Sequence, residues 1–362
     1  MRWLLGVAFV CCGIVAVLIV LHARYNDVSQ AQGGMRVVLR IPNRAEYDYT
    51  LTAPITEINK IGALKSQLIT LVRKQLGWKS APGDPTKADA HDPASMALQV
   101  DFTGDRASII TAALSNADAQ AQLGKITLAM KTVFPAAHAF TSPDPASVFQ
   151  SANSMQDTVR LILEKRLNPA GTMALHSFAQ GDDEIVLEIS GEHDPDHVTY
   201  LLTADAHISF SLLSDNIDVE ENDNQQGVTL VDKMTGKEIN APEALKSAVT
   251  ILDGTALAPT SHMEYDPFNG KPEIAFSILG EANQQHFGAM TEGNLERTLA
   301  IVRGTGARAE IISAPVIKAR IDRRGVITGN FTVQQATEMA TLFNAGALPV
   351  QVQIVESRVM PK

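Results

Sequence analysis

The most informative segment of the sequence runs from residue 311 to 356 and reads IISAPVIKARIDRRGVITGNFTVQQATEMATLFNAGALPVQVQIVE. Its middle predicts a helix that begins at Thr332, because Thr332 and Gln335 have the spacing of a capping box. Gly346 follows the last apolar position of that helix and marks its end. Residues 348–356 then alternate apolar and polar side chains, which predicts a strand. The stretch therefore predicts a helix that leads directly into a half-buried strand.

Similar patterns extend towards the N-terminus. Apolar residues recur at spacings of three and four in residues 56–77 and 155–167, which predicts two amphipathic helices. Strand-like runs surround them at 34–41, 184–190 and 207–213. This mixture predicts an α+β fold in which a sheet packs against a helical layer.

The composition restricts the classes of function. Of the 362 residues, 45% are hydrophobic and 19% charged, which is typical of a globular chain. Thirty basic and forty acidic residues give a net charge of −10, which disfavours a nucleic-acid-binding protein. The two cysteines are Cys11 and Cys12, so the remaining chain cannot form a disulfide framework or a cysteine-ligated metal site.

Residues 3–21 form an uncharged apolar stretch near the N-terminus. Nineteen helical residues span roughly 28 Å, close to the thickness of a bilayer core, so residues 1–22 predict a transmembrane anchor. The charges around it favour a cytoplasmic N-terminus and a periplasmic body. A cleaved signal peptide and a lipoprotein are the alternatives, but the stretch is long for the first and Cys11 follows Val10 rather than a small residue.

One cluster of polar residues resembles a metal site. His193 and His197 stand four residues apart with carboxylates between them. However, Pro195 suits the first turn of a helix and Asp194 suits its N-cap, so we favour a capped helix start over metal binding. The sequence shows no nucleophile elbow, zinc-protease motif or nucleotide fingerprint, and we predict no catalytic residue, cofactor or metal.

Three short sequence motifs in residues 311–356 resemble those of a known family. They are Ser313–Ile317 (SAPVI), Gly329–Thr332 (GNFT) and Ala345–Pro349 (AGALP), in that order. This order resembles the SecD family of bacterial protein-export membrane proteins. Further matches are Gln32-Gly33-Gly34 and Arg166-Leu167-Asn168. Ser190 departs from the family pattern, which usually has proline there.

The resemblance implies a periplasmic unit with two parts. These would be a ferredoxin-like base of residues 34–213 plus 326–358 and a smaller inserted α+β head of residues 214–325. Residues 214–226 contain five acidic and no basic residues, and this composition shift coincides with the expected start of the head. SecD proteins continue into further membrane helices that carry a proton pathway together with SecF. We expect this chain to lack that pathway, since residues 3–21 contain no carboxylate.

The resemblance implies a role as an accessory of Sec-dependent protein export. The expected partners are the Sec translocon, SecF- or SecD-type membrane proteins and unfolded polypeptide on the outer face of the inner membrane. Candidate contacts with that polypeptide are five apolar residues of the head, Met263, Tyr265, Phe268, Phe276 and Ile278. Ordinary core packing is the alternative for all of them, and more so for Phe276 and Ile278.

Two other functions stay open at this point. The first is an envelope assembly or regulatory module that has the SecD periplasmic fold and no export role. The second is an extracytoplasmic enzyme, which would need a polar pocket around His193 and His197. We expect the protein not to be an enzyme.

Overall fold

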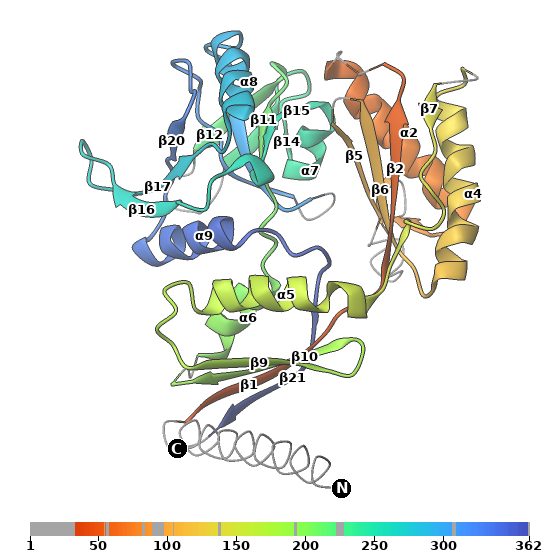
Figure 1. The fold of residues 1–362 in the computed structure, drawn as a ribbon. Helices are drawn as coiled ribbons and strands as arrows, with labels where there is room; N and C mark the ends of the chain where they lie inside the picture. The colour runs from red at the N-terminus through yellow and green to blue at the C-terminus, as the bar shows by residue number, and fades with distance from the viewer. Residues whose placement is uncertain are drawn as a thin grey trace, which may run out of the picture.

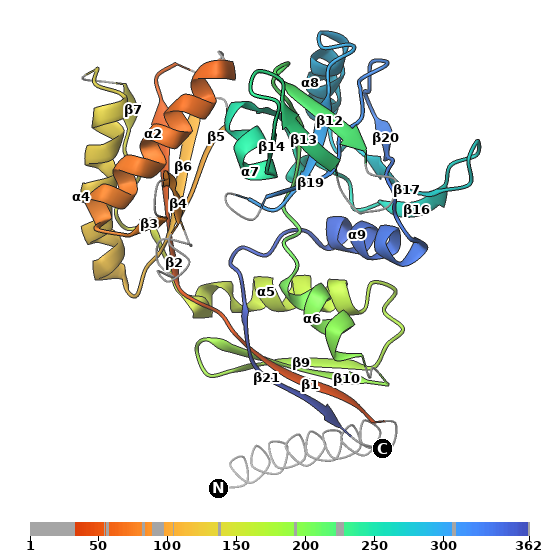
Figure 2. The ribbon, with the colours of Figure 1, turned by 180° about the vertical axis from the view of Figure 1, so that it is seen from behind.

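The computed structural model contains three parts, of which two have one hydrophobic core each and the third has two (Figure 1). The structure describes residues 33–53, 55, 58–81, 84–88, 98–103, 105–136, 139–191, 194–221, 228–305 and 309–360. We call the three parts the base, the insert (residues 44–150) and the head (residues 208–345). The insert and the head lie side by side above the base, as both views show (Figures 1 and 2).

The base is one antiparallel sheet covered on one face by two helices. Its strands run in the order β21-β1-β10-β9. Alternate residues of β1, namely Met35, Val37 and Leu39, are almost fully buried and belong to the core that the sheet shares with the helices. The elements are β1 (Gly34–Arg40), α5 (Ala152–Leu167), β9 (Leu175–Gln180), β10 (Glu184–Ser190), α6 (Pro195–Thr203) and β21 (Gln353–Met360).

Two long segments interrupt the chain of the base. The insert lies between β1 and α5, and the head lies between α6 and β21. Both leave the base on the side of α5 and α6 (Figures 1 and 2). Residues 204–207 lead up into the head and residues 346–352 lead back down. We call these two crossings the neck.

The insert is a sheet of short antiparallel strands with two helices on one face. The strand order is β5-β6-β2-β7, and β8 also pairs with β2. Its core joins Tyr47 and Ile109 of the sheet to Leu68 of α2 and Ile126 of α4. The elements are β2 (Arg44–Leu51), α2 (Ile58–Leu76), β3 (Ser80–Ala81), β4 (Asp84–Ala88), β5 (Gln99–Thr103), β6 (Arg106–Ala112), α4 (Asn116–Val133), β7 (Phe140–Thr141) and β8 (Phe149–Gln150).

The head contains a four-stranded sheet, β15-β11-β18-β19, and two three-stranded sheets, β12-β13-β14 and β16-β17-β20. Its strands are β11 (Ile208–Leu212), β12 (Ile217–Glu221), β13 (Val228–Asp232), β14 (Lys237–Ile239), β15 (Val249–Asp253), β16 (His262–Tyr265), β17 (Pro272–Ser277), β18 (Leu299–Arg303), β19 (Glu310–Ser313) and β20 (Arg324–Ile327). Its helices are α7 (Ala241–Ala244), η1 (Leu245–Ser247), η2 (Gly254–Ala256), α8 (Glu281–Glu292) and α9 (Val333–Ala345).

Helix α9 joins the head to the base. Its N-terminus has the predicted capping box, in which Thr332 accepts from the backbone of Gln335 and Gln335 accepts from the backbone of Thr332. Met339 and Phe343 contribute to the head core, whereas Leu342 contributes to the base core. The helix therefore lies between the two parts, as Figure 1 shows.

The cores divide the chain differently from the boundaries expected for base and head. Residues 44–150 form a core of their own instead of extending a base of 34–213. The chain enters the head at residues 204–207, and the acidic segment contributes β12 inside it. At the other end α9 packs in the head core, although 326–358 was expected in the base. Periodicity shows which face of an element is buried and does not show which element covers it.

Two other expectations concern the ends of the described chain. Strand β21 begins at Gln353 and not at residue 348, because residues 346–352 cross from head to base. The predicted anchor, residues 1–22, lies outside the described residues. Among the helices that the structure describes, none combines the length and apolar character needed to cross a membrane.

Candidate functional site

The head carries a cleft of about 910 Å³. Strand β19 forms one wall, and the turn at 328–331 with the first turns of α9 forms another. Residues at the base of the β16–β17 hairpin, Tyr200 of the base and Arg303 of β18 also line the cleft. The volume is at the upper end of what ligand sites occupy, roughly 300–1,000 Å³. Head and base therefore contribute jointly to one concave surface.

Strand β19 lies at the edge of its sheet. It pairs with β18 alone among the described strands, and all four of its residues line the cleft. An edge strand exposes backbone N–H and C=O groups that another extended chain can pair with. Ile312 and Phe331 supply apolar surface beside it. This wall is suited to an extended polypeptide segment.

The β16–β17 hairpin presents two of the predicted contact residues to solvent. Tyr265 is 58% exposed and Phe268 is 96% exposed. The tip is well ordered by Asp266, whose carboxylate accepts from the backbone N–H of Phe268 at 2.7 Å and from the amide of Asn269 at 2.6 Å. Figure 1 shows the hairpin projecting from the head. A large aromatic side chain is thus held outside the core on a structured turn.

The other three predicted residues pack inward. Phe276 and Ile278 are 4% and 3% exposed, and Met263 packs against the same core. The ring of Phe276 lies 5.0 Å from that of Phe210, between their centroids. Phe276 and Ile278 are therefore corrected to core residues, since the side chains of β17 alternate between the two faces of its sheet.

One carboxylate in the cleft wall was not predicted as a site residue from the sequence. Glu273 of β17 lines the cleft and is only 6% exposed. Burial, followed by the nearby charges of Asp266 and Glu264, raises the pKa of its carboxyl group above the usual range. Among the described residues this carboxylate has no hydrogen-bond or ion-pair partner. A glutamate in a strand gives no indication of its own burial, so only the fold identifies it.

Arg166 of α5 holds both crossings of the neck. Its guanidinium donates to the carbonyl of Ala204 at 2.9 Å and to that of Leu201 at 3.2 Å, at the end of α6. It also donates to the carbonyl of Gly346, at the end of α9, at 3.0 Å. The side chain is 1% exposed, and this burial lowers its pKa to about 10. The Arg-Leu-Asn motif and the AGALP motif are therefore in contact here, and neither motif by itself predicts this contact.

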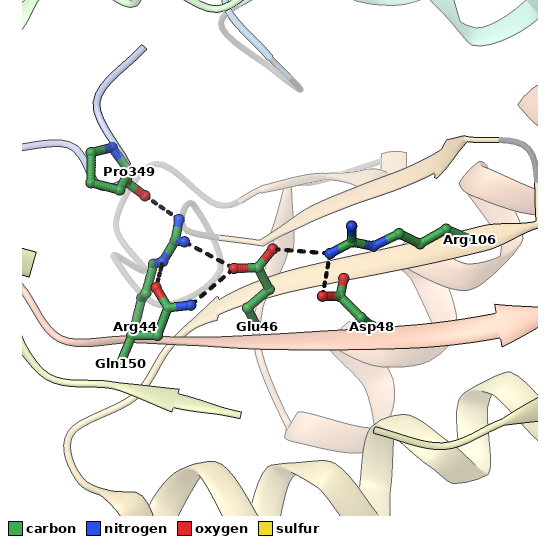
Figure 3. Close-up of polar contacts among 6 residues, drawn as sticks. All are labelled: Arg44, Glu46, Asp48, Arg106, Gln150 and Pro349. Carbon is green, nitrogen blue, oxygen red and sulfur yellow. Dashed lines mark hydrogen bonds and ion pairs between the residues drawn. The ribbon is translucent and has the colours of Figure 1, made fainter. Parts of the chain in front are cut away.

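A second polar cluster ties the insert to the neck (Figure 3). The Arg44 guanidinium donates to the carbonyl of Pro349, to the side chain of Gln150 at 2.7 Å and to Glu46 at 2.9 Å. Gln150 in turn donates to Glu46 at 3.1 Å. Arg106 pairs with Asp48 at the far end of the same row. The returning crossing is therefore held by the base and by the insert.

The structure describes only part of the His193–His197 cluster, for which the sequence favours a capped helix start over a metal site. His193 lies outside the described residues, and within them no three His, Cys, Asp or Glu side chains are grouped as metal ligands. Asp194 caps α6 by accepting from the backbone N–H groups of Asp196 and His197, as the favoured alternative predicts. The His197 ring Nδ1 lies 2.9 Å from a carboxylate oxygen of Glu338, which links α6 to α9.

Comparisons with known proteins find similarity to SecD proteins. Residues 228–350 match the family model of the SecDF P1 head subdomain. The matched part of the chain is therefore similar to the periplasmic part of SecD proteins. The protein translocase subunit SecD of Rickettsia conorii is 33% identical over 212 residues, which cover 57% of this chain and 39% of the relative. That of Acetobacter pasteurianus is 32% identical over 198 residues, or 54% and 36% of the two chains.

A solved structure described as a membrane component SecDF that enhances protein export is also similar. It is 23% identical, with a TM-score of 0.44, and the match covers 58% of this chain and 95% of that one. This chain spans about two fifths of the length of the SecD relatives named above. The SecD-like match thus covers little more than half of the chain.

Proposed function

We propose that this chain is a SecD-like accessory of Sec-dependent protein export that binds polypeptide on the outer face of the membrane. The observation that carries the proposal is the cleft along β19, since an edge strand beside apolar side chains suits an extended chain. Tyr265 and Phe268 lie outside the cleft lining but are exposed on the hairpin whose residues Asp266 and Lys271–Glu273 line it, so they offer further apolar surface. The relatives' name, protein translocase subunit SecD, supports the same role.

The details of the proposal are the membrane anchor, the partners, the absence of catalysis and the fold of the base, all as expected from the sequence. We propose that residues 3–21 anchor the body to the inner membrane, that the partners are the Sec translocon and SecF-type proteins, and that no catalysis is involved. We also propose that the base is ferredoxin-like. Its element order, β1-α5-β9-β10-α6-β21, and its antiparallel sheet with β1 and β10 in the centre support this assignment.

Site-specific photocrosslinking tests the proposal. A photoreactive residue replaces Ile312 in the cleft, Phe268 at the hairpin tip, or Leu161 of α5 as a control that is 52% exposed. In cells that export a signal-bearing reporter, we expect crosslinks to the reporter in transit from positions 312 and 268 and none from 161.

The other outcomes are equally informative. Reporter crosslinks that are absent at 312 and 268, or equally strong at 161, would contradict polypeptide binding in the cleft. Crosslinks to a folded envelope protein in their place, together with unchanged export after depletion of this chain, would favour the alternative of an envelope assembly module.

A further inference from the structure

The buried carboxylate of Glu273 is unusual because neighbouring carboxylates raise the free energy needed to keep its charge buried. Glu264 stands directly opposite Glu273 in the register of β16 and β17, so the two side chains leave the same face of the hairpin. Like charges in that arrangement destabilise a strand pair. Asp266 adds a third carboxylate at the end of β16. The hairpin therefore concentrates negative charge around a side chain that is only 6% exposed and lines the cleft.

No cation of the described chain offsets this charge at close range. Lys271 precedes Glu273 by two residues and also lines the cleft, yet its ammonium forms no ion pair within 4.0 Å among the described residues. Among the described residues, Glu264 pairs with His262 alone, at 3.5 Å, and both of these side chains are largely exposed. The Arg303 guanidinium, which also lines the cleft, already pairs with Glu310 at 2.5 Å. Glu338 accepts from Gln334 and contacts His197.

An unpaired buried carboxylate is normally replaced or paired, because its desolvation is not offset. Glu273 lies on the wall of a cleft that an extended chain fits, so the missing cation can arrive with the occupant. We propose that Glu273 receives the ammonium or guanidinium group of a lysine or arginine in the bound polypeptide. This inference rests on the proposed function and adds to it a preference for basic side chains at one position.

The test compares two peptides that differ in one charge. Each is an acetylated and amidated ten-residue peptide of alternating valine and threonine, with lysine or its uncharged analogue norleucine at the centre. Binding to the full-length protein in detergent is measured by fluorescence anisotropy at low salt. A charge-assisted hydrogen bond predicts about tenfold tighter binding of the lysine peptide. The preference should fall as salt screens the charges.

Two variants test whether the preference for the lysine peptide depends on Glu273. Glu273→Gln keeps the size of the side chain and removes its charge, and we expect it to bind both peptides equally. Glu238→Gln is the matched control, because Glu238 is an exposed strand glutamate of the head outside the cleft lining. It should keep the preference. Circular dichroism and thermal unfolding confirm that each variant folds.

The outcomes separate this inference from the proposed function. Equal binding of both peptides to the unaltered protein, or a preference that survives Glu273→Gln, would overturn the inference and leave polypeptide binding intact. Failure of both peptides to bind the unaltered protein at millimolar concentration would contradict the proposed function and the inference together. A preference lost in Glu273→Gln and kept in Glu238→Gln supports both.

Discussion

At the level of single residues, Arg166 is the side chain whose substitution we expect to reduce stability most. Its guanidinium satisfies carbonyl groups from α6 and from the end of α9, which lies 180 residues further along the chain. Carbonyls at helix ends carry partial negative charge, so a buried cation is favourable there even without a carboxylate in contact. The planar fork of arginine reaches several acceptors in a way that lysine cannot.

We predict that Arg166→Lys lowers the free energy of unfolding by about 2–4 kcal/mol, because buried carbonyls lose their donor. Arg160→Lys is the control on the same helix. Arg160 is partly exposed, pairs with Asp157 and Glu164 and donates to the Ser177 hydroxyl at 3.4 Å, so that change should cost less than about 1 kcal/mol. Urea unfolding followed by circular dichroism measures both. Similar costs for the two variants would show that Arg166 has no special role.

Glu273 predicts a pH dependence of opposite sign to that of most carboxylates. Its pKa is raised in the folded state, by burial first and then by Asp266 and Glu264. The folded chain therefore keeps this proton to a higher pH than the unfolded chain, and Glu273 lowers stability as the pH rises above its ordinary pKa. Glu273→Gln should raise Tm by a few degrees at pH 7, and the gain should vanish near pH 4. A gain that is equal at both pH values would contradict this explanation.

At the element scale, α9 depends on its first turn. The capping box of Thr332 and Gln335 satisfies N–H groups that an α-helix leaves unpaired. Because α9 contributes to the cores of head and base, fraying at its N-terminus also loosens the cleft wall formed by Gln335 and Glu338.

We predict that Thr332→Ala costs about 1 kcal/mol in chemical unfolding, whereas Thr332→Ser restores most of the loss. Thr337→Ala serves as the control, since Thr337 lies exposed in the middle of the same helix and its hydroxyl bonds only to the carbonyl of Val333. That substitution should be neutral or slightly stabilising, because alanine is the better helix former. If both substitutions cost the same, the cap contributes nothing specific.

At the scale of the whole molecule, the insert docks on the head as well as on the neck. Gly62 of α2 lies so close to η1 that a Cβ atom there would be 1.5 Å from the carbonyl oxygen of Lys246. Only glycine permits this approach of two backbones. Together with the bond from Arg44 to Pro349, the contact sets the position of the insert relative to the head.

Two glycines on the helices of the insert should therefore respond oppositely to alanine. Gly62→Ala should separate α2 from η1 and speed hydrogen exchange at residues 245–247 while the insert itself stays folded. Gly124→Ala in α4 meets no atom within 4 Å and should stabilise the insert by about 1 kcal/mol, because alanine favours a helix. Unchanged exchange at 245–247 in Gly62→Ala would contradict the docking contact.

Much of the local structure could be predicted without the fold. The helices at 58–76, 152–167 and 333–345 and the strands β1 and β10 were all expected near these positions. The caps at Asp194 and Thr332 were also expected. Such features depend on residues within one or two turns of each other, so the sequence pattern contains them directly.

The site was predicted less well. The head hairpin was recognised as a candidate, and Tyr265 and Phe268 are exposed there, but Phe276 and Ile278 belong to the core. The edge position of β19 and the cleft beside it depend on strand order, which no local pattern reports. Glu273 was missed because the cleft wall around it is formed by segments that are far apart in the sequence.

Local patterns in the sequence were enough to predict the α+β character, the main helices with their caps, and the SecD resemblance of the residues around SAPVI, GNFT and AGALP. The separate insert of residues 44–150 and the joining of two neck crossings by Arg166 became visible in the folded chain. The same holds for the low exposure of Glu273, which has no partner among the described residues. The physical reason is range: helix and strand signals come from near neighbours, whereas burial and pairing come from segments that the fold brings together.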